Sequence, residues 1–569
     1  MLNKNFIANF VKNKGYFLIG LVLSCLVLWP LTKPGYFSHH DDVQVIRLYE
    51  MDKCIKDGQI PCRWVPDLGG GYGYPLFNYY APLPYYIGEI FYLIVGDFLI
   101  AAKLMFVFSF VLAYVFMYLL GSVFWGRRGG SLSAIFYAYI PYHAVNMYVR
   151  GAIGELWAMA FFPLILYSLY RLAKKTNFQN LIGFAISLAL LITSHNLSTM
   201  LFFPAVVIFC LIFYFGNKNF KFIKYAILSI IISFLLTSFY WLPSAMEGKY
   251  VHLETMTVGY FSYTEHFKGL RKLFLDRTWG WGSSIREYPG SEKDQMPYQI
   301  GIVHLFGLLI SLIGSIFLYK GKNKKSVLLV LGSCAFFILL SIFMIHPRSV
   351  NIWKIFDPLL KYLQFPWRFL ILISFFISFA SGAIFMFIKG KTKLVLWLVL
   401  VILVTAMNFS YFKPEKFIGV TESDYLSGTY WEKQIKRSIF DYLPIYAKMP
   451  PRDLVTVNYQ IIEGKAEVTE FNKGTNWIDL EINAETTAKI MLSQYYFPGW
   501  EVEINGEKTA IDYNNDLGLM TIGVEPGNSL IKVELHNSMV RTIGNGLSLV
   551  SIFGLVGVSI WEKNKKKQK

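Results

Sequence analysis

Long apolar runs dominate the pattern of hydrophobic and polar positions along the chain. A run of about 17 to 25 apolar residues is long enough to cross a bilayer as a helix. The sequence holds twelve such runs, with approximate centres at Val22, Phe110, Phe136, Pro163, Ala185, Val206, Ile230, Leu308, Phe336, Ile373, Leu400 and Ile552. The pattern therefore predicts a polytopic α-helical membrane protein with about twelve transmembrane helices.

One shorter apolar stretch, from Pro82 to Val95, does not fit this series. It starts with two prolines and carries Glu89. If it crossed the membrane, every later loop would change sides, and the basic clusters from Arg127 onward would face outward. We therefore interpret it as an interfacial or re-entrant helix below the first outer loop.

Basic residues fall on alternate connections between the apolar runs. By the positive-inside rule these connections are cytoplasmic, as are both ends of the chain. The clusters are the N-terminal lysines, Arg127 with Arg128, Arg171 with Lys174 and Lys175, Lys218 with Lys221 and Lys224, Lys320 to Lys325, Lys389 to Lys393, and Lys563 to Lys569. The remaining connections then form the outer face: residues 33–82, 244–297 and 346–365, and a long segment over 411–539.

The last outer segment has a different periodicity. From about Val455 apolar and polar residues alternate, and Asn505-Gly506 and Pro526-Gly527 are turn signals. This pattern predicts a small β-sandwich followed by one anchoring helix. The expected domains are a multi-spanning domain over 1–412, an extracytoplasmic β-rich domain over 413–541, and a C-terminal transmembrane helix with a basic cytoplasmic tail over 542–569.

Composition agrees with the apolar pattern. Only 16% of the residues are charged and 54% are hydrophobic, which is typical of a chain whose main solvent is lipid. The net charge of +17 raises the question of nucleic acid, but its placement follows the topological rule, so no nucleic-acid partner is expected. The first apolar run lacks a small-residue cleavage site, so we expect it to stay as a first helix in an integral cell (plasma or inner) membrane protein.

Two of the five cysteines lie in a polar loop. Cys25, Cys210 and Cys334 lie in apolar runs, where a thiol behaves as a small hydrophobe. Cys54 and Cys62 lie in the first outer loop, where an oxidising compartment allows a disulfide. A bridge and two reduced thiols both remain open.

The first outer loop contains the adjacent carboxylates Asp41 and Asp42. A carboxylate at a membrane boundary is partly desolvated, so it is able to accept a proton from an acceptor hydroxyl. The pair is also suited to a divalent cation, Mg²⁺ or Mn²⁺. The alternative is structural: Asp41, with Gln44 three residues later, forms a capping-box-like start for a helix running to about Lys56.

Two other features of this loop argue against a zinc site and against a phosphate-binding loop. The pair His39-His40 has no further His or Cys at ligand spacing, so a structural zinc site is not expected. The glycines from Gly69 to Gly73 lack the Lys-Ser/Thr of a phosphate loop and follow no strand. They predict a tight turn with aromatic walls.

A second polar cluster, Arg150 with Glu155, lies at the outer junction between the third and fourth runs. Such a pair is costly there unless it lines a cavity or contacts headgroups. Arg150 is suited to a lipid phosphate, and Glu155 to orienting Arg150 or a sugar. The alternatives are an arginine that snorkels to water and a first-turn glutamate that favours the helix dipole.

His195 and Arg368 lie at the outer ends of other runs. Each places a polar or cationic group at headgroup depth among aromatic residues. If the helices bundle around one cavity, both residues join Arg150 in a phosphate site. Otherwise His195 is a local hydrogen-bonding residue and Arg368 is an interfacial anchor.

Several motifs carry a family resemblance. They are His40-Asp41-Asp42, Arg63-Trp64-Val-Pro66, Gly71-Tyr72-Gly-Tyr74-Pro-Leu-Phe-Asn78-Tyr-Tyr80, Arg150-Gly-x-x-Gly-Glu155 and Leu363-Gln-Phe-Pro-Trp-Arg368. Together they resemble a bacterial membrane family labelled 6-pyruvoyl-tetrahydropterin synthase-related, although the histidine cluster of a pterin synthase is missing. The tail element Tyr496-Phe-Pro498-Gly499-Trp500 resembles the β-module of YfhO-like proteins, and the whole is similar to the type C (GT-C) glycosyltransferase superfamily.

This resemblance implies an inverting transfer of a sugar from a polyprenyl-phosphate donor to a glycan, lipid or protein acceptor on the non-cytoplasmic face. It implies Asp41 or Asp42 as the base, Glu155 as a third catalytic residue, and Arg150, Arg368 and His195 at the donor phosphate. His40, Arg63, Trp64, Tyr72, Tyr74 and Asn78 are expected to shape the loop or contact substrate. A lipid-linked sugar flippase, and a non-catalytic envelope-assembly protein that binds glycan through its β-domain, are the alternatives. The aromatic residues of the β-module itself are expected to be core.

Overall fold

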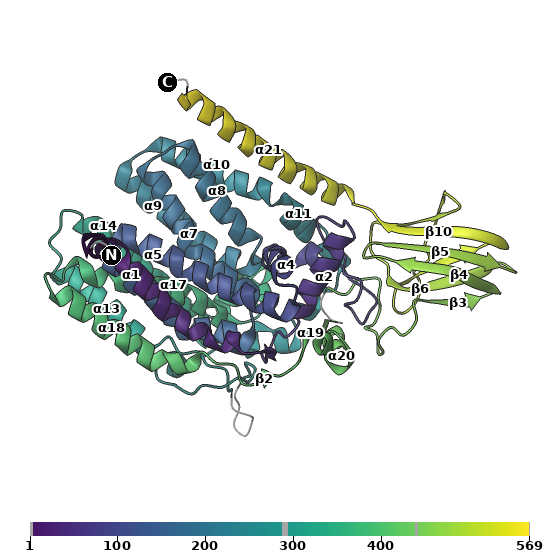
Figure 1. Cartoon of the computed structure of the whole chain (residues 1–569), viewed down its shortest axis with the longest axis horizontal. Helices are drawn as coiled ribbons and strands as arrows, with labels where there is room; N and C mark the ends of the chain where they lie inside the picture. The colour runs from purple at the N-terminus through teal and green to yellow at the C-terminus, as the bar shows by residue number, and fades with distance from the viewer. Residues whose placement is uncertain (1–3, 287–293, 439–441, 568–569) are drawn as a thin grey trace. The chain divides into compact units, whose positions relative to one another are not determined.

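The structure is a computed structural model that describes residues 4–286, 294–438 and 442–567 (Figure 1). The predicted outer loop 244–297, the β-rich segment 413–541 and both terminal basic clusters therefore lie partly outside the described residues. The chain divides into two compact units. The first, here called the helical unit, comprises residues 1–42, 102–233 and 257–420, and the second, here called the β-bearing unit, comprises residues 43–101, 234–256 and 421–569.

The helical unit is built from apolar helices joined by short helical turns. Its main helices are α1 (Lys4–Cys25), α5 (Phe98–Tyr139), α7 (Ile153–Lys174), α8 (Phe178–Ile192), α9 (Asn196–Asn217), α10 (Phe220–Leu236), α13 (Ile302–Phe317), α14 (Lys324–Ile345), α17 (Leu370–Ser381) and α18 (Thr392–Asn408). The shorter ones are η1 (Leu26–Thr32), α6 (Pro141–Ala144), η2 (Val145–Arg150), η5 (Gly259–Phe261), η6 (Tyr263–Glu265), α12 (Leu270–Phe274), η7 (Pro347–Ser349), α15 (Val350–Ile355), α16 (Asp357–Leu360), η8 (Lys361–Leu363), η9 (Pro366–Phe369), η10 (Gly382–Met386) and η11 (Phe409–Tyr411). Strand β1 (Tyr36–Phe37) pairs antiparallel with β2 (Phe417–Ile418).

Helix α17 is the centre of the helical unit. Every residue of Leu370–Ser381 is buried, and α7, α13 and α14 pack against it. A helix that is apolar on all sides lies either in a protein core or in lipid, and the burial of α17 shows that other parts of the chain cover it. The helices that carry the candidate site, η2 with α7 and η9 with α17, therefore meet at the best-packed part of the unit.

All twelve predicted centres lie in helices, but by length and composition only eight described helices, or nine with one bent pair, are able to cross a membrane. The predicted and counted spans differ at four places. The second and third runs are two helices that meet at a non-helical kink at Gly126, as their separation predicts, and they are counted once because α5 includes both. The polar Thr193-Ser194-His195 segment ends α8 after 15 residues, and α13 has 16. Helix α10 is bent by 75° from α11 (Ser238–Met246).

The β-bearing unit combines short helices with two antiparallel sheets. Its helices are α2 (Gln44–Lys56), α3 (Leu76–Tyr79), α4 (Leu83–Val95), α11, η3 (Gly248–Tyr250), η4 (Leu253–Met256), α19 (Glu422–Tyr425), α20 (Gly428–Arg437) and α21 (Met539–Lys567). Its strands are β3 (Tyr459–Glu463), β4 (Ala466–Lys473), β5 (Trp477–Ala484), β6 (Ala488–Tyr495), β7 (Trp500–Ile504), β8 (Glu507–Thr509), β9 (Leu519–Val524) and β10 (Gly527–Leu535). Helix α4 coincides with the predicted Pro82–Val95 helix.

The two sheets pack face to face. One has the strand order β4-β5-β10-β7-β8 and the other β3-β6-β9. In the register Ile531 pairs with Leu480 on one side and Ile504 on the other. Inward residues of both sheets form one buried cluster, as the alternating pattern predicts. The hairpin between β7 and β8 turns at Asn505-Gly506, with φ of 53° and 86°, as a type I′ turn requires.

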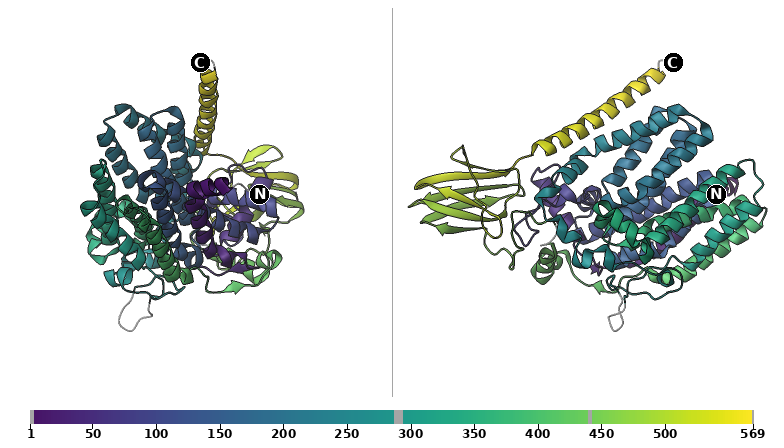
Figure 2. Two further views of the ribbon diagram at one scale, coloured as in Figure 1. Left: turned by 60° about the vertical axis from the view of Figure 1, so that its left-hand side comes forward. Right: turned by 180° about the vertical axis from the view of Figure 1, so that it is seen from behind.

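Helix α21 follows the last strand of the five-stranded sheet (Figure 2). It packs against α11 of the same unit, and its Met539–Trp561 portion is apolar enough to cross a membrane. The predicted fold class is therefore confirmed: a mostly helical chain with many apolar candidate spans, a C-terminal β-sandwich and a final apolar helix.

Candidate functional site

The segment between α6 and α7 positions Arg150. Residues Val145–Arg150 form one π-helical turn, which ends at Gly151 with φ of 65°. A side chain at Gly151 would meet the His39 ring at 2.2 Å, so only glycine allows this close passage. Helix α7 then begins at Ile153. The reversal brings Arg150 and Glu155 onto the same side of the chain.

Glu155 accepts hydrogen bonds from both ends of the Arg150 guanidinium. Arg150 Nη1 donates to Oε2 and Nη2 to Oε1, each at 2.7 Å. The Tyr142 hydroxyl donates to Oε2 at 2.8 Å, and Arg150 Nη1 also donates to Asn146 Oδ1 at 2.5 Å. Arg150 is 9% exposed and Glu155 is 2% exposed. Such a buried bidentate pair fixes the orientation of the guanidinium.

Arg368 from η9 joins the same carboxylate. Its Nε donates to Glu155 Oε1 at 3.1 Å, and its Nη1 donates to the Leu363 carbonyl at 2.8 Å and to Gln364 Oε1 at 3.1 Å. We call Arg150, Glu155 and Arg368 the arginine triad. Two guanidinium groups and one carboxylate leave one positive charge in a buried place, where an anion is the natural counter-ion.

Aromatic rings support both guanidinium groups. The guanidinium carbon of Arg150 lies 4.7 Å from the Trp367 ring centroid, and that of Arg368 lies 5.0 Å from the Phe365 centroid. The two rings stack on each other with centroids 4.8 Å apart. These contacts favour arginine specifically, because a planar guanidinium stacks on a ring and an ammonium does not.

His195 lies next to the triad but carries no charge at neutral pH. It is the N-cap of α9, and its Nδ1 accepts a hydrogen bond from the Ser198 amide at 3.2 Å. The neutral ring therefore carries its proton on Nε2. Burial lowers the pKa of His195 to about 4, against the opposing effect of Glu155. His195 therefore offers a phosphate a hydrogen-bond donor and no positive charge. It was expected at the end of the fifth apolar run, which forms α8, and it is the N-cap of the next helix, α9.

The first outer loop reaches the arginine triad through its backbone. The amides of His40 and Asp41 donate to the carbonyls of Val149 and Arg150, both at 2.9 Å. Burial lowers the pKa of Arg150, but the carboxylates, Glu155 first and Asp41 among them, raise it above its usual value. Asp41 and Asp42 are half-buried. The structure thus places Asp41 within electrostatic reach of Arg150.

The structure does not place Asp41 at the N-cap of the helix that follows it. Helix α2 spans Gln44–Lys56 as expected, but its N-cap is Val43, which makes no side-chain cap hydrogen bond in the described structure. The Gln44 side chain instead accepts a hydrogen bond from the Tyr85 hydroxyl at 2.5 Å. A residue that lies two positions before the N-cap is too early to serve as the first residue of a capping box.

A pocket of about 500 Å³ lies beside the aromatic support. Its lining residues include Tyr260, His266, Ser284 and Arg286. Trp367 Nε1 donates to Ser284 Oγ at 3.0 Å, Ser284 Oγ contacts His266 Nδ1 at 2.9 Å, and His266 Nε2 contacts the Tyr260 carbonyl. Since a carbonyl only accepts, His266 is the Nε2-protonated tautomer and Ser284 donates to its Nδ1. One hydrogen-bonded chain thus links the pocket wall to the ring under Arg150.

The His40 side chain joins the first outer loop to the loop that carries this pocket. Its Nε2 donates to the Trp281 carbonyl at 2.7 Å. His40 therefore holds the backbone next to Asp41 against residues 257–286. This contact is consistent with the loop-shaping role expected for it.

The other expected loop residues lie in the β-bearing unit, where most of them pack against the β-sandwich. Trp64 is fully buried and meets Trp500 edge-on, with centroids 5.5 Å apart. The Tyr72 carbonyl accepts from the Tyr495 amide at 3.0 Å. Tyr74 pairs with Val65 in an isolated bridge. Their contacts are those of packing residues.

Arg63 and Asn78 belong to a different hydrogen-bond network of the β-bearing unit. Arg63 Nη1 donates to Asn78 Oδ1 at 3.0 Å, and Asn78 Nδ2 donates to Glu247 Oε2 at 2.9 Å. Neither residue is in the helical unit. The structure therefore separates the predicted site residues into two groups.

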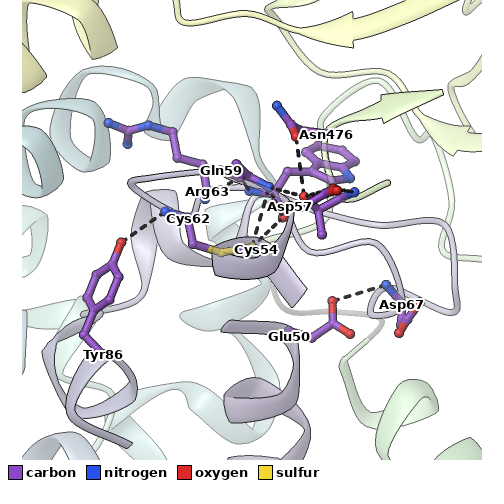
Figure 3. The surroundings of a disulfide bond; sticks show 11 residues. Glu50, Cys54, Asp57, Gln59, Cys62, Arg63, Asp67, Tyr86 and Asn476 are labelled. Carbon is purple, nitrogen blue, oxygen red and sulfur yellow. Dashed lines mark hydrogen bonds between the residues drawn. A yellow bond between two sulfur atoms is a disulfide. The ribbon is translucent and has the colours of Figure 1, made fainter. Parts of the chain in front are cut away.

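Cys54 and Cys62 form a disulfide in the structure, with Cα atoms 5.5 Å apart (Figure 3). The Tyr86 hydroxyl accepts from the Cys62 amide at 3.1 Å. Asp57, within the bridged loop, accepts from the Thr475 hydroxyl at 2.8 Å and from Trp477 Nε1 at 3.2 Å. The bridge therefore shapes the part of the first outer loop that contacts the β-sandwich.

The expected divalent cation has few ligands to hold it. Among the residues that the structure describes, no group of three or more His, Cys, Asp or Glu side chains is placed to bind a metal ion. Asp41 and Asp42 offer two carboxylates, but Asp41 acts on the Arg150 guanidinium, and a second cation there would be repelled. Asp41 and Asp42 alone are therefore a poor set of ligands for a divalent cation.

Sequence reasoning missed Tyr142, Asn146 and the pocket on residues 259–286. Asn146 lies four residues before Arg150, a spacing that brings two side chains together on a helix, and Tyr142 reaches Glu155 from α6, across the π-helical turn. The pocket residues come from 3₁₀ turns. The sequence feature that could have indicated these pocket residues is the density of aromatic and polar residues in the loop 244–297.

Comparison with known proteins agrees with the sequence motifs. Residues 77–285 match the family model described as "6-pyruvoyl-tetrahydropterin synthase related domain; membrane protein". An uncharacterised protein of Lactococcus lactis subsp. cremoris (strain MG1363) is 23% identical over 336 residues, which are 56% of this chain. The match covers 52% of that relative, so this chain spans about half of its length.

Solved structures of glycosyltransferases are among those similar to this chain. The arabinofuranosyltransferase AftD from Mycobacteria has a TM-score of 0.46 and 12% identity, with 72% of this chain and 28% of that one covered. The oligosaccharyltransferase of Archaeoglobus fulgidus, in a complex with Zn and sulfate, has a TM-score of 0.41 and 14% identity, with 77% and 58% covered.

The matched residues 77–285 begin near the end of the first outer loop and end among the residues that line the pocket, so they include Arg150, Glu155 and His195. The resemblance that the motifs predicted is therefore confirmed for this part of the chain. Residues 77–285 are therefore similar to the 6-pyruvoyl-tetrahydropterin synthase-related family of membrane proteins.

Proposed function

We propose that this protein is a membrane glycosyltransferase that transfers a sugar from a polyprenyl-phosphate donor to an acceptor hydroxyl of an envelope glycan, lipid or protein. The observation that carries the proposal is the arginine triad, with one net positive charge, within electrostatic reach of Asp41. A cationic site and a carboxylate that act on each other are the two groups that such a transfer needs.

The proposed reaction is a single displacement with inversion. Asp41 or Asp42 removes the proton of the acceptor hydroxyl, and the acceptor oxygen forms a bond to the anomeric carbon. The bond between that carbon and the phosphate oxygen breaks, and its electron pair leaves on the lipid phosphate. The sugar ends on the acceptor, the proton on the aspartate and the negative charge on the phosphate.

The charges of the site suit this sequence of events. Before the reaction the Asp41 carboxylate balances the single positive charge of the triad. When the carboxylate takes the proton, that balance is lost at the moment when the phosphate gains its charge. Arg150 and Arg368, which Glu155 and the aromatic rings hold in place, then stabilise the leaving group without reorganising.

The remaining groups have supporting roles in this proposal. His195 offers an Nε2 proton to a phosphate oxygen, and the pocket beside Trp367 receives the sugar or the acceptor. Glu155 is a positioning residue, because four hydrogen bonds already occupy its two oxygens. In the proposed topology the site faces outward from the cell membrane, with both termini in the cytoplasm.

The test uses the full-length protein in proteoliposomes with a polyprenyl-phosphate sugar that is radiolabelled in the sugar. We expect transfer of the label to an added envelope acceptor together with release of the lipid phosphate. Movement of intact sugar-lipid across the bilayer, with no broken sugar–phosphate bond, would support a flippase instead. Absence of both, with a function that depends on the β-sandwich alone, would support an assembly protein.

A further inference from the structure

A second buried arginine cluster lies in the β-bearing unit. Arg541, at the start of α21, donates from Nε to Glu247 Oε2 at 2.9 Å, and Arg63 connects to the same carboxylate through Asn78. Arg63 is 6% exposed and Arg541 is 1% exposed. Two guanidinium groups and one carboxylate again leave one positive charge in a buried place.

Both arginines line one pocket. Its volume is about 140 Å³, and its walls come from the bridged first outer loop, the end of the sandwich and the start of α21. Its lining residues include Arg63, Asn476, His536, Asn537 and Arg541. The pocket therefore lies where the sandwich continues into the apolar C-terminal helix.

One donor in this pocket is not used. Arg63 donates from Nη2 to the Phe239 carbonyl and to Asn545 Oδ1, at 2.9 and 2.8 Å, but its Nε has no hydrogen-bond partner among the described residues. A buried donor of a charged group that lacks a partner costs free energy. Arg63 lines the pocket, so a water molecule or an ion bound there is one way to complete its hydrogen bonds.

The electrostatics of the pocket favour an anion. Burial, and next the positive charge of Arg541, lower the pKa of Arg63 to about 10. The amides at the start of α21 add the positive end of a helix dipole. Asn476, Asn537 and His536 supply neutral polar groups around the two guanidinium groups. A bound anion would satisfy Arg63 and reduce the repulsion between the arginines.

We propose that this pocket binds a phosphate group, either free or as the headgroup of a lipid. Its volume accommodates a tetrahedral oxyanion with a few water molecules, and it lies at the first turn of a helix that is apolar enough to cross a membrane. The site is distinct from the arginine triad, because every lining residue belongs to the β-bearing unit. The proposal does not depend on the proposed glycosyl transfer.

The test adds one negative charge to the pocket wall without touching the arginine network. Asn537 lines the pocket and is exposed, so Asn537→Asp is expected to fold. The matched control is Asn528→Asp, the same change at an exposed position of β10. Apparent melting temperatures of the full-length protein in neutral detergent check that both variants are folded.

Two probes distinguish the source of the phosphate. Binding of inorganic phosphate is measured by calorimetry, and retention of phosphatidic acid is measured by native mass spectrometry after extraction from nanodiscs that contain it. We expect one of the two to weaken about ten-fold or more in Asn537→Asp and to stay unchanged in Asn528→Asp. A change in phosphate binding assigns the site to a free anion, and a change in phosphatidate retention alone assigns it to a lipid.

The result that overturns the proposal is equal binding of both probes by all three proteins, whether that binding is strong or absent. Phosphate binding that survives in Asn537→Asp belongs elsewhere in the chain, with the arginine triad as the first candidate. Arg63 and Arg541 would then be structural residues that connect the first outer loop to α21.

Discussion

Arg150 and Glu155 face each other through two parallel hydrogen bonds of 2.7 Å, one from each terminal nitrogen of the guanidinium. The carboxylate that holds Arg150 also holds Arg368. The geometry makes Glu155 the residue on which both guanidinium positions depend, and it gives the three residues distinct testable roles.

Glu155→Gln should strongly destabilise the helical unit. The change leaves Arg150 and Arg368 buried with no carboxylate between them, and breaking a buried pair in this way costs about 3 to 5 kcal/mol. We expect a clear fall in the apparent melting temperature in detergent. Glu507→Gln, at an exposed position, should leave it unchanged; an equally stable Glu155→Gln protein would mean that the triad is not held as described.

Arg368→Lys should lower kcat/KM for transfer by about ten- to a hundred-fold. Lysine keeps the charge but loses the planar group that contacts Leu363, Gln364 and Glu155 together, and hydrogen bonds to a charged group are each worth about 1.5 to 3 kcal/mol. The exposed Arg348→Lys is the matched control. If both variants transfer at the normal rate, Arg368 does not bind the donor phosphate.

Stability should fall as the pH is lowered from about 6.5 to about 4, in part because of His266. Burial lowers its pKa from 6.5 to about 4, so between these values the unfolded chain binds the proton and the folded chain does not. The contribution, up to about 3 kcal/mol, is complete above pH 6.5 and lost below pH 4. His266→Gln should flatten melting temperature against pH in this window; an unchanged slope would show that His266 does not contribute.

Removing divalent cations should not abolish transfer. The arginine triad supplies the positive charge that a metal would otherwise provide, and Asp41 acts on Arg150. We therefore expect activity to persist after dialysis against EDTA. Loss with EDTA and recovery with Mg²⁺ or Mn²⁺ would instead assign a cation to Asp41 and Asp42.

Much of the fold can be predicted from the sequence, because membrane helices need continuous apolar runs and half-buried strands alternate apolar and polar residues. Continuous apolar runs gave all twelve helical centres, and alternation with an Asn505-Gly506 turn gave the sandwich. The runs also located the breaks near Gly126 and Thr193–His195. Helix length was harder to predict, since α8 has only 15 residues and α13 only 16.

The site was less predictable than the fold. Charged residues in apolar surroundings singled out Arg150, Glu155 and Arg368, because such residues persist only with partners. Their mutual pairing depends on a π-helical turn and on η9, which comes more than 200 residues later. The motifs also led us to expect Arg63 to shape the first outer loop or contact substrate. Its partners are Asn78, Phe239 and Asn545 of the β-bearing unit.

In the proposed reaction a carboxylate of the first outer loop removes the proton of the acceptor hydroxyl. Sugar transfer from a polyprenyl-phosphate donor should be measured for Asp41→Asn, Asp42→Asn and the double variant, at matched protein levels and melting temperatures. We predict that one single variant and the double variant lose at least about a hundred-fold in kcat, as expected for a missing general base. Normal turnover in all three proteins would contradict the account.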